Sequence, residues 1–153
     1  MRTIRLFVTC CLGAVLLWGS ACGTASGEQS QAAPAASPAT PDPAHAQGAK
    51  VYSLYCVACH MQNGAGIPGM NPPLIKTDWV LGDKERLINV LLKGLNEPIE
   101  IDGQVYKNIM PSHAHLSDAD IAAVLTYVRA SFGNQAGAIG EAEVAAARAK
   151  LGS

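Results

Sequence analysis

The chain has 153 residues, of which 49% are hydrophobic but only 5% aromatic, and its 11 basic and 12 acidic residues give a formal net charge of −1. This length suits one domain of ordinary size with appendages. The near-zero charge argues against nucleic acid as a partner, because binding to a phosphate backbone draws on clustered Lys and Arg. So few large side chains also predict a small apolar core, and we therefore expect a bound group that fills the centre.

The first 21 residues are typical of a bacterial secretory signal. Arg2 and Arg5 form a positive n-region, Leu6 to Trp18 an apolar h-region, and Gly19-Ser20-Ala21 a small-residue stretch. The apolar run is too short for a comfortable transmembrane span, which takes about 20 residues. We therefore expect residues 1–21 to be removed on export to the bacterial periplasm.

The end of this signal, Trp18-Gly19-Ser20-Ala21-Cys22, resembles a bacterial lipobox, in which Cys22 is lipidated and becomes the first mature residue. Gly19 stands where a Leu is usual, so cleavage nearby, which leaves a soluble periplasmic protein, is the alternative. Because several acyl chains anchor a protein stably, a lipidated Cys22 predicts membrane attachment.

Residues 22–47 are rich in Ala and Pro and contain almost no large apolar side chain. Such a composition cannot bury enough surface to offset the entropy of ordering. Four prolines are also expected to stop regular helix in this segment: Pro34, Pro38, Pro41 and Pro43. We interpret residues 22–47 as a disordered tether and residues 48–153 as the folded domain.

The folded domain opens with a segment of helical periodicity, residues 48–58, which leads into Cys56-Val57-Ala58-Cys59-His60. C-x-x-C-H is the attachment signature of c-type haem. Two thiols three residues apart on one helical turn can both reach the vinyl groups on one edge of a macrocycle, and the adjacent His can bind iron beneath the ring. We expect one covalent haem c, held through Cys56 and Cys59, with His60 as proximal ligand.

Three other interpretations of this cysteine pair are weaker. A structural zinc site needs four Cys or His ligands, and no second cluster follows. A thioredoxin-type redox pair needs a βαβ context, whereas the surrounding pattern is helical. A disulfide between Cys56 and Cys59 would be geometrically tight and would leave His60 without a task.

Further along the chain, Asp83 is a candidate N-cap for a helix that runs through Lys93. Residues 99–106 then alternate around Asp102-Gly103, a tight-turn pair, and predict a small hairpin that steers the chain toward Met110.

A haem electron carrier needs a second axial ligand to iron, and five residues are candidates: Met61, Met70, Met110, His113 and His115. Met61 follows the proximal ligand directly and emerges on the same side of the ring. Met70 follows so soon after His60 that the chain there is still expected on the proximal face of the haem. The chain before Met110 is long enough to reach the opposite face. We expect Met110 to be the ligand. His113 or His115, or an open sixth position, are the alternatives, and Met110 could instead fill a gap in the core.

Two more helices are expected after the distal loop. Ser117 followed by Asp120 resembles a capping pattern, and the helix behind it has an apolar stripe: Ile121, Val124, Leu125 and Val128. Residues 141–151 predict a short Ala-rich helix to which we assign no chemistry.

Residues 48–134 resemble the class I monohaem cytochromes c. Gly48 and Tyr52 stand where that family packs its first helix against its last, which implies Val124 and Tyr127 as partners. The resemblance implies an all-α fold, three to five helices wrapped around one haem, with the small hairpin as an addition. The stretch from Ser117 to Gly133 is similar to cytochrome c domains that serve dehydrogenases, nitrite reductases or terminal oxidases.

The resemblance also implies further residues at the haem. Pro72, two residues before Leu74, matches the family's Pro-x-Leu element, whose proline carbonyl holds the proximal imidazole. Met110-Pro111 matches the distal loop. Trp79 is expected to line the pocket, either with its indole N–H toward a haem propionate or by plain packing.

These features predict an electron-transfer protein rather than an enzyme. Iron held by His60 and Met110 would cycle between Fe(III) and Fe(II), with no small-molecule substrate, and redox protein partners would dock transiently at the exposed haem edge. Scattered lysines do not predict docking by a strong charge field. The alternatives are a cytochrome c subunit fixed in a respiratory or dehydrogenase complex, a haem enzyme or gas-binding protein with a displaceable ligand, and an assembly subunit whose haem is only structural.

Overall fold

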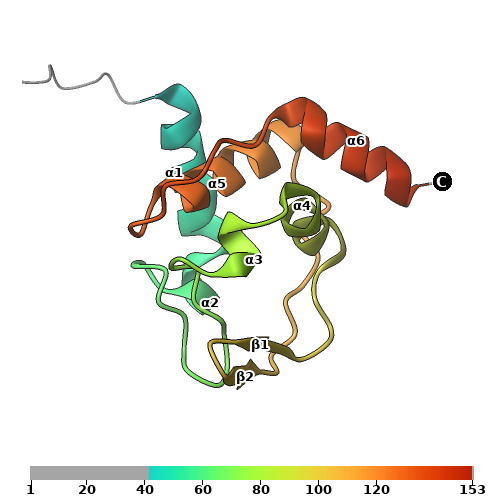
Figure 1. Cartoon of the computed structure of the whole chain (residues 1–153). Coiled ribbons are helices and arrows are strands. Elements are labelled where there is room, and N and C mark those ends of the chain that lie inside the picture. The colour runs from blue at the N-terminus through green and yellow to red at the C-terminus, as the bar shows by residue number, and fades with distance from the viewer. Residues whose placement is uncertain (1–41, 153) are drawn as a thin grey trace, which may run out of the picture. The chain divides into compact units, whose positions relative to one another are not determined.

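The computed structural model describes residues 42–152, so the expectations for the signal, for Cys22 and for most of the tether lie outside it. Within this range the chain is mostly helical, as expected, with one two-stranded antiparallel sheet (Figure 1). No helix in residues 42–152 has the length and apolar character that crossing a membrane requires. The elements, in chain order, are α1 (Pro43–Tyr55), α2 (Val57–His60), α3 (Asp78–Leu81), α4 (Lys84–Lys93), β1 (Ile99–Ile101), β2 (Gln104–Tyr106), α5 (Asp118–Ala130) and α6 (Glu141–Leu151).

Helix α1 begins earlier than the expected start at Gly48. Asp42 is its N-cap, with the side chain accepting a hydrogen bond from the backbone N–H of Ala44 at 3.0 Å. Pro43 follows at the first helical position, where a missing N–H costs nothing and the fixed φ suits the helix. The expectation that Pro43 stops regular helix is therefore wrong: an Asp-Pro pair starts one here.

Helices α1 and α5 pack closely against each other at Gly48 (Figure 1). A Cβ atom at Gly48 would collide with the carbonyl oxygen of Ala123 and would lie 2.6 Å from Cβ of Tyr127. The ring of Tyr52 stacks on Tyr127 with 5.5 Å between centroids. The nearest neighbours of Gly48 are thus Ala123 and Tyr127, and Tyr127 is one of the two partners that the resemblance implied. Val124, the other implied partner, is buried in the same core as Tyr52 and lines the pocket described below.

Replacing Gly48 with alanine is expected to lower the free energy of unfolding by about 1–3 kcal/mol, because α1 must move away from α5 to accommodate the methyl group. Chemical denaturation of the holoprotein measures the loss. Gly137→Ala is the matched control, since a Cβ at Gly137 meets no atom within 4 Å. Equal stability of the two variants would contradict a tight helix crossing at Gly48.

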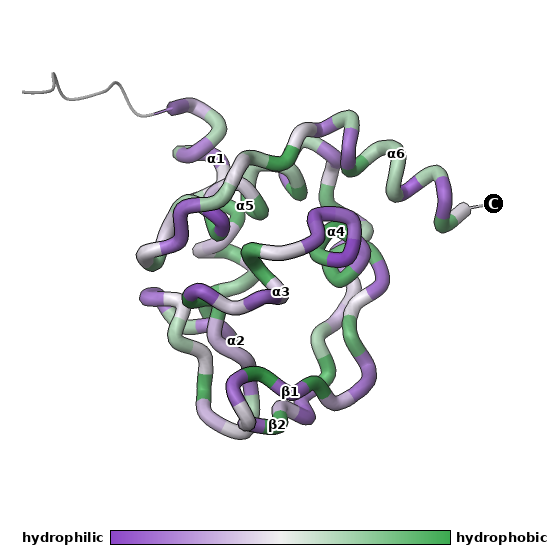
Figure 2. Tube along the Cα trace, in the orientation of Figure 1, coloured by the Kyte–Doolittle hydropathy of each residue, from purple (hydrophilic) through white to green (hydrophobic). Residues whose placement is uncertain are grey.

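Helix α4 begins and ends as the sequence predicted. The carboxylate of Asp83 accepts a hydrogen bond from the N–H of Arg86 at 2.6 Å, and Gly94 ends the helix at a φ of 77°. Its polar and apolar residues alternate at helical spacing, as Figure 2 shows along the trace. The apolar stripe is buried: Leu87, Ile88, Leu91 and Leu92.

The expected hairpin forms around Asp102-Gly103, where both residues have positive φ, 50° and 77°. Ile99 pairs with Tyr106 in the antiparallel register, and the side chain of Tyr106 is buried. The chain then returns beside the end of α4, where the backbones of Leu95 and Met110 exchange two hydrogen bonds of 2.9 Å. These two hydrogen bonds set the position of the Met110 backbone relative to the core.

Helix α5 starts at the predicted cap, because the hydroxyl of Ser117 accepts a hydrogen bond from the N–H of Asp120 at 3.1 Å. The amide of Gln47 donates a 2.8 Å hydrogen bond to the Asp120 carboxylate, and with the Ser117 hydroxyl it holds the pKa of Asp120 below its usual value. This bond joins the start of α5 to α1.

Helix α6 covers the core beside α4 and α5, with Val144 and Ala147 buried. Its charged side chains pair with α4, Glu143 with Lys84 at 3.1 Å and Lys150 with Glu85 at 2.8 Å. The short helix α3 was not anticipated. Its cap is Thr77, whose hydroxyl accepts a hydrogen bond from the N–H of Val80 at 3.2 Å.

Candidate functional site

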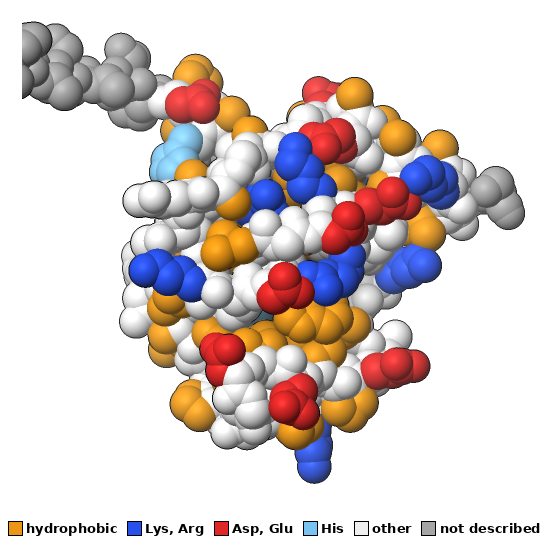
Figure 3. Space-filling model, in the orientation of Figure 1, with side chains coloured by type: hydrophobic (Ala, Val, Ile, Leu, Met, Phe, Trp, Pro, Cys, Tyr) orange, Lys and Arg blue, Asp and Glu red, His pale blue; other side chains and the backbone are white. Residues whose placement is uncertain are grey.

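A large apolar pocket opens between α3 and the β1–β2 hairpin. The pocket is lined mostly by apolar side chains. Figure 3 shows hydrophobic side chains gathered in a hollow at this place. All of the site residues predicted from the sequence line the pocket: Cys56, Cys59, His60, Pro72, Leu74, Trp79 and Met110.

His60 closes the single turn of α2, and its imidazole is buried at the pocket wall. Nδ1 lies 3.0 Å from the carbonyl oxygen of Pro72. When Nδ1–H donates to this carbonyl, Nε2 carries a free lone pair, which is the tautomer that binds a metal. Burial lowers the pKa of His60, an effect that the Pro72 carbonyl opposes and nearby His113 reinforces. Burial thus favours the neutral imidazole, and the contact with Pro72 orients it.

The segment that carries Pro72 is held in place by the chain before it. The N–H of Leu74 donates a 2.7 Å hydrogen bond to the carbonyl of Gly64, and the N–H of Gly66 bonds to the carbonyl of His60 at 3.1 Å. At Gly66, φ is 65° and a Cβ atom would lie 2.6 Å from the carbonyl oxygen of Pro72. Only glycine at position 66 allows the two sides of this loop to approach each other so closely.

Sequence reasoning did not assign a role to Asn134, which fastens the same segment from the other side. Its side chain is 3% exposed. The amide donates hydrogen bonds to the carbonyls of Leu74 at 2.8 Å and Val128 at 2.7 Å, while its oxygen accepts one from the N–H of Lys76 at 2.7 Å. Asn134 therefore links the end of α5 to the chain just beyond Pro72.

The two thiols lie on the same side of the pocket as His60. Cys56 is half-buried and Cys59 is exposed, and both are free. Burial raises the pKa of the Cys56 thiol to about 11, assisted by the neighbouring Cys59. Among residues 42–152, no cluster of three or more His, Cys, Asp or Glu side chains could hold a metal ion, so no zinc site surrounds these thiols in that range.

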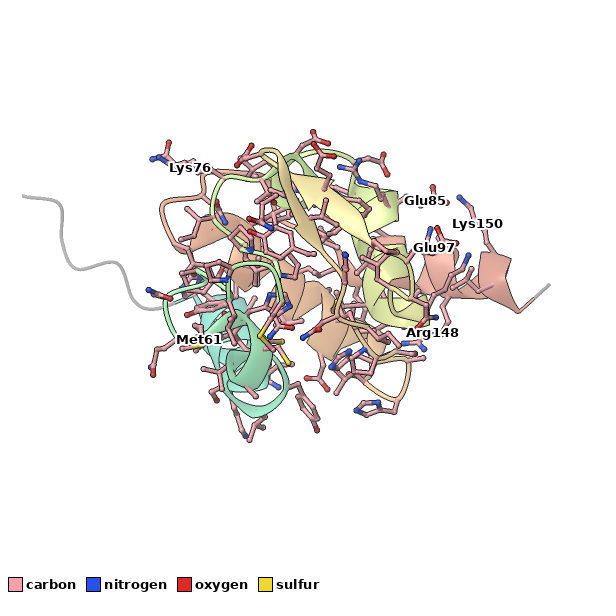
Figure 4. The ribbon with its side chains drawn as sticks, turned by 90° about the horizontal axis from the view of Figure 1, so that it is seen from below. Met61, Lys76, Glu85, Glu97, Arg148 and Lys150 are labelled. Carbon is pink, nitrogen blue, oxygen red and sulfur yellow. The ribbon has the colours of Figure 1, made fainter. Side chains whose placement is uncertain are left out.

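The candidate distal methionines separate clearly by position. Met110 is half-buried at the pocket wall, whereas Met70 is 50% exposed and Met61 44% exposed, and neither lines the pocket. Figure 4 shows Met61 at the surface beside α2. His113 also lines the pocket, and the contact of its Nδ1 with the carbonyl oxygen of Pro111 at 2.9 Å leaves its Nε2 free, as at His60, so His113 stays the alternative distal ligand. His115 is exposed and lies outside the pocket.

Trp79 lies on α3 and lines the pocket, half-buried. The guanidinium of Arg86 covers its ring, 4.8 Å from the centroid, and donates hydrogen bonds to the carbonyl and carboxylate of Asp78 at 2.6 and 2.9 Å. This cation–π contact restrains the indole.

The residues present fit a haem c. The cavity is apolar, two thiols stand at its edge, an imidazole is oriented within it by the Pro72 carbonyl, and a thioether comes to it from a distant segment. Together with the mainly helical fold, this donor set defines a haem-binding protein of the cytochrome class.

Comparison with known proteins agrees with that class. The family model of cytochrome c matches residues 45–131, and the chain belongs to the cytochrome c family, whose members carry covalent haem c and transfer electrons. It is 46% identical over 95 residues to a cytochrome c-552 of Thermus thermophilus, and 46% identical over 93 residues to a second cytochrome c-552 of the same species. It is 34% identical over 96 residues to the cytochrome c subunit of a quinone alcohol dehydrogenase of Gluconobacter oxydans.

These likenesses cover 58–60% of this chain. They span 64% and 70% of the two cytochromes c-552 but only 19% of the dehydrogenase subunit.

Proposed function

We propose that the protein is a periplasmic electron carrier with one haem c, attached through Cys56 and Cys59 and bound at iron by His60 and Met110. It shuttles electrons between redox proteins such as a dehydrogenase and an oxidase or reductase, and does not act as an enzyme by itself. The observation that carries this proposal is the convergence on one apolar pocket of both thiols, the oriented imidazole and the Met110 thioether.

In this proposal the bound haem supplies one-electron exchange between Fe(III) and Fe(II). The chain's own residues keep the site unchanged during that exchange. Pro72 fixes the tautomer and orientation of His60 through the 3.0 Å contact, and the Leu95–Met110 backbone pairing sets the position of Met110. The apolar lining excludes water, which limits the solvent rearrangement that accompanies a change of charge.

Covalent attachment is tested by extracting the purified protein with acid and acetone. We expect all colour to stay with the polypeptide and the intact mass to exceed that of the mature chain by one haem. Release of the colour into the acetone would contradict attachment at the two thiols. The double variant Cys56→Ser, Cys59→Ser is the control, and any haem that it retains is expected to be extracted.

Membrane attachment through a lipidated Cys22 is part of the proposal, and mass spectrometry of the mature N-terminus tests it.

Redox proteins are the proposed partners, docking transiently at the mouth of the pocket. The likeness to a dehydrogenase cytochrome c subunit supports a second candidate, a subunit fixed in a dehydrogenase complex. Co-purification of a redox enzyme from detergent-solubilised membranes at constant stoichiometry would favour that candidate over a free carrier.

A further inference from the structure

The chain between Met110 and α5, residues 111–117, is here called the distal segment. On its inner side the distal segment is tied to the end of α4. The N–H of His113 donates a hydrogen bond to the carbonyl of Leu91 at 2.7 Å, and the hydroxyl of Ser112 donates one to the carbonyl of Leu92 at 2.6 Å. Both ties lie in the half of the segment that is closer to Met110.

The other half is held by Arg148 of α6. Its Nη1 donates to the carbonyl of Ala114 at 2.8 Å and its Nη2 to the carbonyl of Leu116 at 2.9 Å. Its Nε donates to the carboxylate of Asp118, the first residue of α5, at 2.7 Å. The planar guanidinium thus spans the distal segment and the start of α5 with three charge-assisted hydrogen bonds. Figure 4 shows Arg148 directed from α6 toward the body of the molecule.

Helix α6, which carries Arg148, is itself fixed against the rest of the fold. Val144 is fully buried and Ala147 is 3% exposed, and these two residues fix the face of the helix that adjoins Arg148. The Lys84–Glu143 ion pair ties the other end of α6 to α4. Helix α6 lies beyond residues 45–131, which match the family model.

We propose that Arg148 is a positioning residue for the distal ligand: it keeps the distal segment closed and thereby holds the sulfur of Met110 in the pocket. The inference rests on the proposed ligation of iron by Met110. Without the guanidinium, the segment loses its outer attachment, and the inner ties at Ser112 and His113 next to Met110 open more often. Met110 then leaves the pocket more readily, and an external ligand can take its place.

The test is a titration of the ferric holoprotein with imidazole. Binding is monitored through the loss of the sulfur–iron charge-transfer band. Arg148→Ala removes all three hydrogen bonds and is expected to bind imidazole at least roughly tenfold more tightly, since the loss of one charge-assisted hydrogen bond from the closed state already corresponds to about tenfold. Arg148→Lys keeps a cation near Asp118 but cannot bridge both carbonyls, so an intermediate affinity is expected. This variant also keeps the test valid if the alanine variant does not fold.

A second measurement is amide hydrogen exchange at Leu116, whose N–H donates to the carbonyl of His113 within the distal segment at 3.0 Å. Its exchange is expected to quicken by roughly tenfold in Arg148→Ala. Lys84→Gln is the matched control, because it removes an exposed ion pair of α6 that does not touch the distal segment. Neither imidazole affinity nor exchange at Leu116 should change in this control.

Unchanged imidazole affinity in a folded Arg148→Ala protein would contradict the role of Arg148. An equal rise in Lys84→Gln would do so as well, because it would trace the effect to general loosening of α6. A wild-type ferric protein without the sulfur–iron band would instead contradict the proposed ligation by Met110, and this inference would fall with it.

Discussion

Replacing Met110 with alanine is expected to abolish the sulfur–iron charge-transfer band and to lower the reduction potential on the order of 0.1 V or more. A thioether is a soft ligand that favours the reduced iron, and axial ligands together set haem potentials over about 0.8 V. Among the described methionines, Met110 is the one that lines the pocket. Optical spectra of the ferric protein and a potentiometric titration measure the two effects.

Met70→Ala is the matched control, since Met70 is 50% exposed and lies outside the pocket, and its spectrum and potential should equal those of the unmodified protein. A band that persists in Met110→Ala would show that another sulfur is the ligand. If the unmodified protein lacks the band and its reduced form binds carbon monoxide at neutral pH, the sixth position is open. That result would favour the gas-binding alternative.

The sequence predicted well those parts of the structure whose cause is local. The Asp83 cap, the Asp102-Gly103 turn and the Ser117 cap each depend on residues within a few positions, and each lies where it was expected. The C-x-x-C-H spacing likewise places both thiols beside His60, with Cys56 as the N-cap of α2 and Cys59 within its single turn. Such signals are legible because the hydrogen bonds that they make hardly depend on the rest of the fold.

Two local signals were misread or missed. Pro43 stands in a Pro-rich stretch, and its role depends on whether the preceding Asp42 caps a helix, which composition does not reveal. The single turn of α3 is too short to show helical periodicity, and its cap at Thr77 is an ordinary residue in a loop. The start of α1 and the single turn of α3 are both stabilised mainly by packing against distant parts of the chain.

The contacts that hold the two sides of the site could not be predicted from patterns in the sequence. Arg148 reaches the distal segment across more than thirty residues of sequence, and Asn134 reaches Leu74 across 60. A long polar side chain near the C-terminus looks the same in sequence whether it is solvated or bonded to buried carbonyls. These long-range contacts become visible only once the helices are placed.

Asn134 gives the other large expected effect. Its three hydrogen bonds satisfy the carbonyls of Leu74 and Val128 and the N–H of Lys76, all with a side chain that is 3% exposed. Each buried group left without a partner costs about 1–3 kcal/mol. Asn134→Ala is therefore expected to lower the free energy of unfolding by about 3 kcal/mol or more, and the melting temperature by roughly 10–20 °C.

Thermal unfolding of the ferric holoprotein measures this loss, and Asn63→Ala is the matched control because the Asn63 side chain is exposed and accepts one hydrogen bond from Ala65. Asn134→Asp separates hydrogen bonding from shape. A carboxylate of the same size still accepts from Lys76 but faces the carbonyls of Leu74 and Val128 without a proton to donate, so at neutral pH it should be at least as unstable as the alanine variant. Its folded-state pKa is then raised, and its stability relative to the unmodified protein should recover as the pH falls through that pKa. A stable, pH-independent Asn134→Asp protein would show that the amide donors of Asn134 are dispensable for holding the chain beyond Pro72.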